Sequence, residues 1–287
     1  MQLLPDVIRR RVRRPSPAMA VAFVALFAAV AGGAYAAGQI NGASIKNNTI
    51  GQAKFTPPTR AKLNHNVGAH WGVIDRNTIG SGIADLRSGP YGSFGVTGAA
   101  AKPPFGTGSL GIQVSGNATS QSPAAEKVAF GNEVDFYNQQ VANLMKVGYR
   151  TFQTGEDAAI SPQNLPNITL EINPHVGSST YTSMTWIPPA APVTNRWTGF
   201  MDATTTGQWY FTGSAGTTTG CNQATTCSFS AAKAALVTFN NGSPATIDTV
   251  AVAKGRDNDY SGAVDGLRVN NTVYDFEAYG VVAKTSP

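Results

Sequence analysis

The stretch NITLEIN (residues 167–173) decides the fold class of this chain. Its apolar residues occupy every second position, so an extended backbone buries them on one face and exposes Thr169 and Glu171 on the other. A strand with one buried and one solvated face is typical of an antiparallel sheet. The stretch therefore predicts a central strand of an all-β domain.

The same alternation recurs on both sides of this stretch, in short segments bounded by Gly, Pro and Asn. Strands are predicted at 109–114, 127–137, 145–150, 180–187, 197–203, 208–212, 246–253, 264–269 and 274–278. Turns are predicted at 240–244 and at Asp265-Gly266, and a surface loop at 213–220. One helix is predicted, capped by Ser228 or Ser230 and ended near Asn240. About ten strands over roughly 220 residues make one domain, so we expect an antiparallel β-sandwich with one short helix.

The N-terminus carries an export signal. Five arginines within residues 9–14 precede a charge-free stretch at 18–38, and Ala34-Tyr35-Ala36 fits an A-x-A cleavage site. We expect cleavage after Ala36. The alternative is an uncleaved signal-anchor helix, because the 21 uncharged residues are just long enough to span a bilayer. With cleavage, the product is secreted and extracellular. Without cleavage, it is anchored at the outer face of the cytoplasmic membrane.

A short periodic segment separates this signal from the body. Isoleucine or phenylalanine recurs every five residues from Ile40 to Phe55, a period that fits neither a strand nor a helix face. Pro57-Pro58 follows it. We therefore divide the chain into a signal peptide or anchor (1–36), a spacer (37–66) and a β-sandwich domain (67–287).

The formal net charge of +5 does not indicate nucleic-acid binding. Five arginines and Asp6 fall within residues 1–17, and 15 acidic residues balance the other 16 basic ones. The exported part has no run of Lys or Arg that would follow a phosphate backbone. We expect no nucleic-acid partner, and membrane contact only through the N-terminal segment.

Two sets of motifs resemble known families. The run INGASIKNNTI (40–50), behind such a signal, resembles the N-terminal regions of surface proteins from high-GC Gram-positive bacteria. In the body, GTGSL (106–110), NITLEI (167–172), VDGLRV (264–269) and YDFE (274–277) resemble secreted bacterial β-sandwich domains of jelly-roll or concanavalin-like build, mostly without assigned function. The VDGLRV segment is also similar to a strand of jelly-roll carbohydrate-binding modules. The resemblance implies a fold and a location more than a ligand.

Cys221 and Cys227 stand six residues apart in a chain expected to meet oxidising conditions, so we predict a disulfide between them. The ring is small and stabilises the fold only locally. A zinc site is the alternative, but the three histidines are distant in sequence.

The cluster of Asp257, Asp259 and Asp265 offers the hard oxygen ligands that Ca²⁺ takes. Its spacing does not match an EF-hand, and Lys254 and Arg256 stand nearby. Two interpretations remain open: a structural calcium site, or a loop whose carboxylates are salt-bridged or solvated. No other cofactor is expected.

Glu133 and Asp135 are similar to the Glu-x-Asp-x-x-Glu strand of laminarinase-type retaining glycosidases. The acid/base glutamate of that motif falls at Asn138, so the motif is broken where the chemistry needs it. We expect an exposed strand face there. A Gly-x-Ser-x-Gly elbow for a nucleophilic serine is also missing from the sequence.

Aromatic residues are the better indication of a ligand. Trp186, Trp197, Trp209 and Tyr210, with Asp202 among their polar neighbours, have the composition of a sugar-binding platform. Core packing is the alternative for each tryptophan. We therefore expect an exported, non-enzymatic β-sandwich that binds a glycan or another cell-envelope polymer. Two other functions remain open: a structural or adhesive surface protein without a glycan ligand, and a glycan-active enzyme.

Overall fold

The structure is a computed structural model of the chain and describes residues 16–19, 21–22, 70–115 and 126–285. The chain divides into two units, Met1–Phe55 and Thr56–Pro287. In the first unit, residues 17–19 and 21–22 are helical. The expected cleavage site and the spacer lie outside the described residues. Within the described residues, no helix is both long and apolar enough to cross a membrane.

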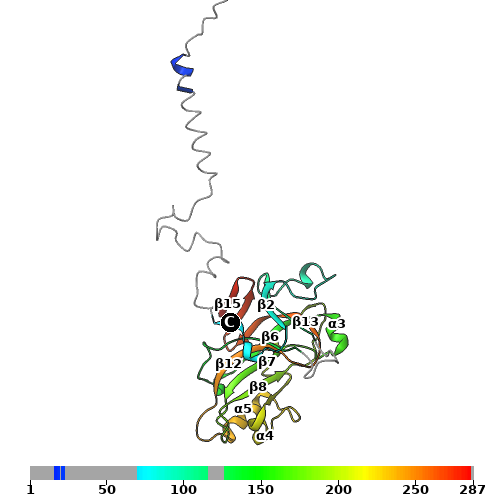
Figure 1. Cartoon of the computed structure of the whole chain (residues 1–287), viewed down its shortest axis with the longest axis vertical. Coiled ribbons are helices and arrows are strands. Elements are labelled where there is room, and N and C mark those ends of the chain that lie inside the picture. Colours follow the sequence, from blue (N-terminus) through cyan, green and yellow to red (C-terminus); the bar gives the residue numbers. More distant parts are fainter. Residues whose placement is uncertain (1–15, 20, 23–69, 116–125, 286–287) are drawn as a thin grey trace, which may run out of the picture. The chain divides into compact units, whose positions relative to one another are not determined.

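The second unit contains two antiparallel sheets (Figure 1). We call the seven-stranded sheet "sheet 1" and the eight-stranded sheet "sheet 2". Sheet 1 has the order β1 (Trp71–Val73), β4 (Val128–Asn132), β12 (Thr246–Lys254), β7 (Asn167–Asn173), β8 (Thr182–Ile187) and β11 (Gln208–Phe211), and β5 (Gln139–Gln140) also pairs with β12. The stretch that decides the fold class thus forms β7, well inside sheet 1.

Sheet 2 is built around a long strand, β13. Its order is β10 (Met201–Asp202), β6 (Val147–Gln153), β13 (Tyr260–Val269), β14 (Thr272–Glu277) and β15 (Gly280–Thr285); β3 (Gly108–Val114) pairs with β13 and with β2 (Ile83–Ser88), and β9 (Arg196–Trp197) pairs with β6. A register shift between Asp265 and Arg268 marks a bulge where β13 pairs with β6.

The two sheets pack face to face, and one hydrophobic cluster contains residues of both. Ile168, Leu170 and Ile172 of β7 are fully buried in it, as the alternation predicts. Val147 and Tyr149 of β6 enter the same cluster from sheet 2. The predicted antiparallel β-sandwich is confirmed at this level.

The described part of this unit holds three α-helices. They are α3 (Gly155–Ile160), α4 (Gly213–Thr219) and α5 (Phe229–Thr238). The predicted helix is α5, and the side chain of Ser228 caps it by accepting the N–H of Ala231 at 3.2 Å. Helices α4 and α5 lie together at one end of the unit, near β8 (Figure 1).

Four sequence-based boundaries need correction. The predicted loop at 213–220 is helix α4. The predicted strand at 197–203 is interrupted, giving β9 and β10. Asp265-Gly266 is a bulge inside β13 rather than a turn. The strand predicted at 127–137 ends at Asn132, whose side-chain oxygen accepts the N–H groups of Val134 and Asp135 at 2.9 Å each and bends the chain out of the sheet.

The predicted cysteine pair is confirmed at the level of geometry. Cys221 and Cys227 lie at disulfide distance, with their Cα atoms 5.7 Å apart. The backbone of this loop pairs with β11, because the N–H of Cys227 donates to the carbonyl of Trp209 at 2.8 Å. The bridge therefore closes a loop that already extends sheet 1.

Candidate functional site

A short strap, residues 74–79, crosses the outer face of sheet 1. Ile74 follows β1 and packs against three alanines of β4 and β12, whose small side chains leave room for it. The chain then turns through the 3-10 helix η3 (Asp75–Asn77). This turn brings Arg76 and Asn77 over strands β7 and β12.

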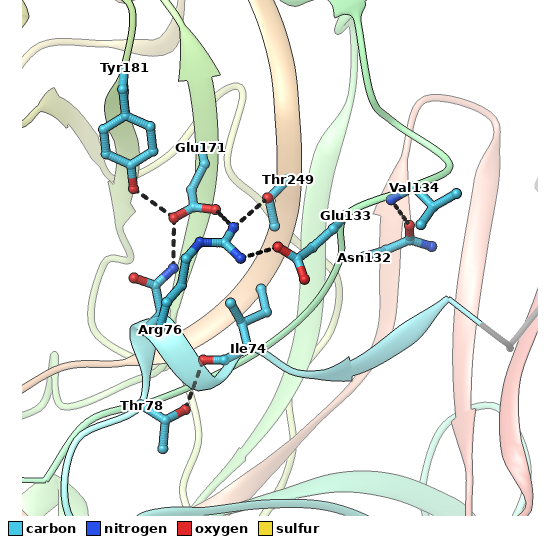
Figure 2. A network of polar contacts seen from close by, with 10 residues as sticks. Ile74, Arg76, Thr78, Asn132, Glu133, Val134, Glu171, Tyr181 and Thr249 are labelled. Atoms are coloured by element: carbon cyan, nitrogen blue, oxygen red, sulfur yellow. Dashed lines mark hydrogen bonds and ion pairs between the residues drawn. The ribbon is translucent and has the colours of Figure 1, made fainter.

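Arg76 joins two carboxylates through one guanidinium (Figure 2). Its Nη1 donates to Glu133, just beyond β4, and its Nη2 donates to Glu171 of β7. Nη2 also donates to the hydroxyl of Thr249 in β12 at 3.2 Å. One side chain thus ties the strap to three neighbouring segments of sheet 1.

Glu171 is the buried carboxylate of this network, with 1% of its surface exposed. Its Oε1 accepts from the Nδ2 of Asn77 at 2.7 Å and from the hydroxyl of Tyr181 at 2.6 Å. Burial alone raises the pKa of Glu171, but the hydrogen bonds, led by that from Tyr181, outweigh it and hold the pKa below its ordinary value. The carboxylate therefore stays ionised at neutral pH.

Tyr181, immediately before β8, is an exposed member of the network. Its side chain points toward Glu171 (Figure 2), yet the residue is 53% exposed. Partial burial, followed by the hydrogen bond to Glu171, raises the pKa of Tyr181, so the phenol keeps the proton that it donates. The ring is held in one orientation. A ligand that stacks on it would therefore pay little conformational entropy.

A β-bulge in β12 lies opposite Glu171. The register shifts between Ile247 and Thr249, which leaves Asp248 as the extra residue. Burial, and next the negative charge of Glu171, raise the pKa of Asp248. A third carboxyl group, that of Asp248, thus lies close enough to the network to interact electrostatically with Glu171.

Hydroxyl groups line the outer face between Tyr181 and Tyr210. In the register of the sheet, Thr169 pairs with Thr185, which pairs with Tyr210 of β11. Because Thr185 is four residues from Tyr181, the two tyrosines lie about 13 Å apart along the strand direction. We call this surface the tyrosine strip; it comprises Thr169, Glu171, Tyr181, Ser183, Thr185 and Tyr210.

The network is better suited to binding than to acid–base catalysis. A retaining glycosidase needs an acid with a raised pKa, about 5–5.5 Å from a second carboxyl group and with substrate between them. Here a guanidinium stands between Glu133 and Glu171, and the pKa of Glu171 is lowered. Asp135, the other acid of the predicted pair, lies 2.7 Å from Nδ1 of His70.

The tryptophans predicted to form a platform are distributed differently. Trp186 and Trp209 are fully buried, and their indole N–H groups donate to the carbonyls of Thr206 and Ala203 at 2.8 and 2.7 Å. Core packing, the alternative considered from the sequence, therefore describes both. The physical reason is strand alternation, which points these rings inward and leaves Tyr210 on the outer face.

Trp197 and Asp202 lie in sheet 2, away from the tyrosine strip. Trp197 is half-buried, packs edge-on against Phe152 with ring centroids 5.9 Å apart, and donates to the carbonyl of Ala101 at 3.2 Å. Asp202 forms an ion pair with Lys146 at 3.3 Å. Of the five predicted ligand-binding residues, only Tyr210 reaches the tyrosine strip.

The three acidic residues considered for calcium do not converge. Asp257 pairs with Lys254, and Asp259 is exposed. Asp265 is fully buried within β13, and its carboxylate accepts the N–H groups of Gly266 and Phe276 at 2.7 and 3.0 Å. Across residues 70–115 and 126–285, no three His, Cys, Asp or Glu side chains gather in a way that could hold a metal ion.

Sequence reasoning missed Arg76, which lies outside every predicted strand, and did not choose Tyr181 as a ligand-binding residue although it lies in the strand predicted at 180–187. One signal pointed to them. Glu171 is a charged residue in an otherwise apolar strand pattern, and such a residue, if covered, needs a cation and hydrogen-bond donors. Comparisons with known protein families, with curated proteins and with solved structures found no match for this chain.

Proposed function

We propose that this chain is an exported, non-enzymatic protein whose β-sandwich, of jelly-roll or concanavalin-like build, binds carbohydrate on the tyrosine strip. The observation that carries the proposal is Tyr181: an exposed ring fixed by a hydrogen bond to a buried, ionised glutamate. Flat aromatic rings accept the apolar face of a sugar, and neighbouring hydroxyl groups bond its hydroxyls.

The length and chemistry of the strip support an oligosaccharide rather than a single sugar. Tyr181 and Tyr210 mark its two ends, about 13 Å apart along the strand direction. Between them Ser183 and Thr169 are partly exposed hydroxyl groups. Arg76, which contacts the strip at Glu171, is itself engaged with Glu133 and Glu171. A neutral glycan therefore fits the strip better than an acidic one.

The proposal is tested by screening the purified full chain against neutral oligosaccharides, including hexamers of glucose, mannose and N-acetylglucosamine. We expect at least one hexamer to bind. Tyr181→Ala should weaken that binding by about tenfold or more, because it removes the preorganised ring that holds one end of the oligosaccharide. Tyr181→Phe should show a smaller loss, since it keeps the ring and removes only the bond to Glu171.

Tyr91→Ala is the matched control. Tyr91 also donates its hydroxyl to a carboxylate, that of Asp85 at 3.0 Å, but it belongs to the sheet 2 side of the domain. Its loss should leave glycan affinity unchanged. If no neutral glycan binds, the proposal fails. If Tyr181→Ala binds as well as the unchanged chain, the site lies elsewhere.

A further inference from the structure

The outer face of sheet 2 carries a hollow of about 350 Å³ with unusual chemistry. Four cationic side chains and two phenylalanine rings line it: Lys146, Arg150, Arg268, Lys284, Phe105 and Phe200. Its volume lies at the lower end of the range for small-molecule sites. It lies on the other sheet from the tyrosine strip, so it is a separate surface.

Two glycines seat the rings that form its walls. Gly266 has φ +59°, and a Cβ at that position would come within 2.1 Å of the ring of Phe105. At Gly148 a Cβ would meet the ring of Phe200 at 2.6 Å and the carbonyl of Met201 at 2.2 Å. Both rings therefore lie directly on the sheet. A residue larger than glycine at either position would collide with the ring and prevent this contact.

The cations surround these rings at cation–π distances. The guanidinium of Arg150 lies 5.4 Å from the centroid of Phe105, and the ammonium of Lys284 lies 5.9 Å from it. Lys146 lies 5.6 Å from the centroid of Phe200. The backbone fixes this arrangement, since Arg268 pairs with Gly148, and Arg150 is two residues further on the same face of β6.

The charges in the hollow are only half compensated. Lys146 pairs with Asp202 at 3.3 Å, and Lys284 pairs with Asp275 at 2.6 Å. Among the described residues, neither arginine has a carboxylate within ion-pair distance. Arg268 donates its Nε–H to the carbonyl of Asn270 at 2.7 Å, which fixes its side chain without using its terminal nitrogens.

We propose that this hollow binds an oxyanion carried by a sugar, that is, the phosphate or carboxylate group of an acidic carbohydrate. Two guanidinium groups offer the planar, paired donors that phosphate and carboxylate oxygens accept. The two rings provide apolar contact for the body of the sugar. This second site lies on the other sheet from the tyrosine strip and takes a different class of ligand.

A nucleic-acid phosphate fits the hollow less well than an acidic sugar. A nucleic-acid backbone needs a track of cations along many phosphates, and the part of the chain after residue 17 has 16 basic against 15 acidic residues. The cations gather instead in one compact hollow. A single charged group beside a compact ring is the ligand that such a shape accepts.

The test is titration calorimetry of the full chain with four probes: glucose 6-phosphate, glucuronate, glucose and inorganic phosphate. We expect at least one of the two charged sugars to bind and glucose not to bind at this site. Comparing glucose 6-phosphate with glucuronate identifies the favoured oxyanion. Inorganic phosphate should bind more weakly than glucose 6-phosphate, because it gains no contact with the rings. Added salt should weaken the binding of the charged sugars.

The double variant Arg150→Gln/Arg268→Gln should lose binding by about tenfold or more. The control is Arg196→Gln. Arg196 is an exposed arginine of β9 outside the hollow, so this substitution removes one positive charge and should leave the affinity for the charged sugar unchanged. If the double variant does not fold, Arg150→Lys keeps the charge, loses the paired donors and should show a partial loss. Three results would overturn the proposal. The folded variant could bind the charged sugar as tightly as the unchanged chain, or neither charged sugar could bind. Duplex DNA could also bind more tightly than the charged sugars through the same arginines.

Discussion

Two buried carboxylates show how local partners decide ionisation. Glu171 and Asp265 are both nearly inaccessible to solvent. Glu171 has Arg76 and two neutral side-chain donors, and its pKa is lowered despite burial. Within the described residues, the hydrogen bonds to Asp265 all come from backbone N–H groups, including that of Phe105 at 3.3 Å, and burial raises the pKa of Asp265 to about 7. Backbone dipoles without a cation do not offset the loss of solvation here.

Asp265 should make the protein less stable as pH rises from about 4 to about 7. In that interval the folded state holds the proton and the unfolded state releases it, so each increase in pH favours unfolding. Between pH 5.5 and pH 8 the loss should be about 2 kcal/mol, at about 1.4 kcal/mol per pKa unit. Urea unfolding at both pH values measures it.

Asp265→Asn is the control for this prediction. It removes the titrating group, so the difference in unfolding free energy between the two pH values should shrink. Both carboxylate oxygens of Asp265 accept N–H groups, whereas an amide has one oxygen, so the variant should be less stable at every pH. The informative quantity is therefore the difference in unfolding free energy between the two pH values. The other titrating groups are common to both proteins, so their contributions cancel. An equal pH dependence in both proteins would contradict the assignment.

At the scale of elements, alternation predicted the strands that bury one face. β7, β3 and α5 lie where their patterns placed them, because each has a periodic apolar face. Helix α4 was missed because its sequence, GSAGTTT, has poor helix propensity. Burial of Ala215 and a hydrogen bond from Thr219 to the carbonyl of that alanine at 2.7 Å stabilise it, and neither is visible in sequence.

The bulge in β13 shows a second limit of sequence reasoning. Asp-Gly is a strong turn signal, but Gly266 uses its positive φ to bulge the strand and to seat Phe105. The sequence shows that a residue permits φ > 0. Whether the chain then turns or bulges depends on neighbouring strands, here β6 and β14.

The disulfide should stabilise one element and leave the fold unchanged. The backbone of its loop is already bonded to β11, at Trp209 and Phe211. Changing Cys221 and Cys227 to Ser should lower the unfolding free energy by about 2 kcal/mol, the chain-entropy value for a seven-residue ring. Denaturant unfolding with unchanged cooperativity would agree. Loss of cooperative unfolding would mean that the bridge holds more than its own loop.

For the whole molecule, composition predicted a near-neutral body but not where its charge gathers. Residues 146, 150, 268 and 284 are far apart in sequence and meet only because β6, β13 and β15 belong to one sheet. The tyrosine strip likewise depends on strand register. The β-sandwich could be predicted from alternation alone, whereas both candidate sites required the topology.

The two proposed sites lie on the outer faces of different sheets, with the hydrophobic core between them. Neither contains a residue of the other, so their ligands should bind independently. The affinity for a charged sugar should change by less than about twofold when a neutral hexamer saturates the strip, and the reverse should also hold, since linkage is reciprocal. Titration calorimetry of each probe with the other in excess measures this. Tyr181→Ala should weaken only hexamer binding, and the double arginine variant should weaken only charged-sugar binding. Mutual exclusion of the two probes would instead show that they share one surface, which would refute the separation of the two sites.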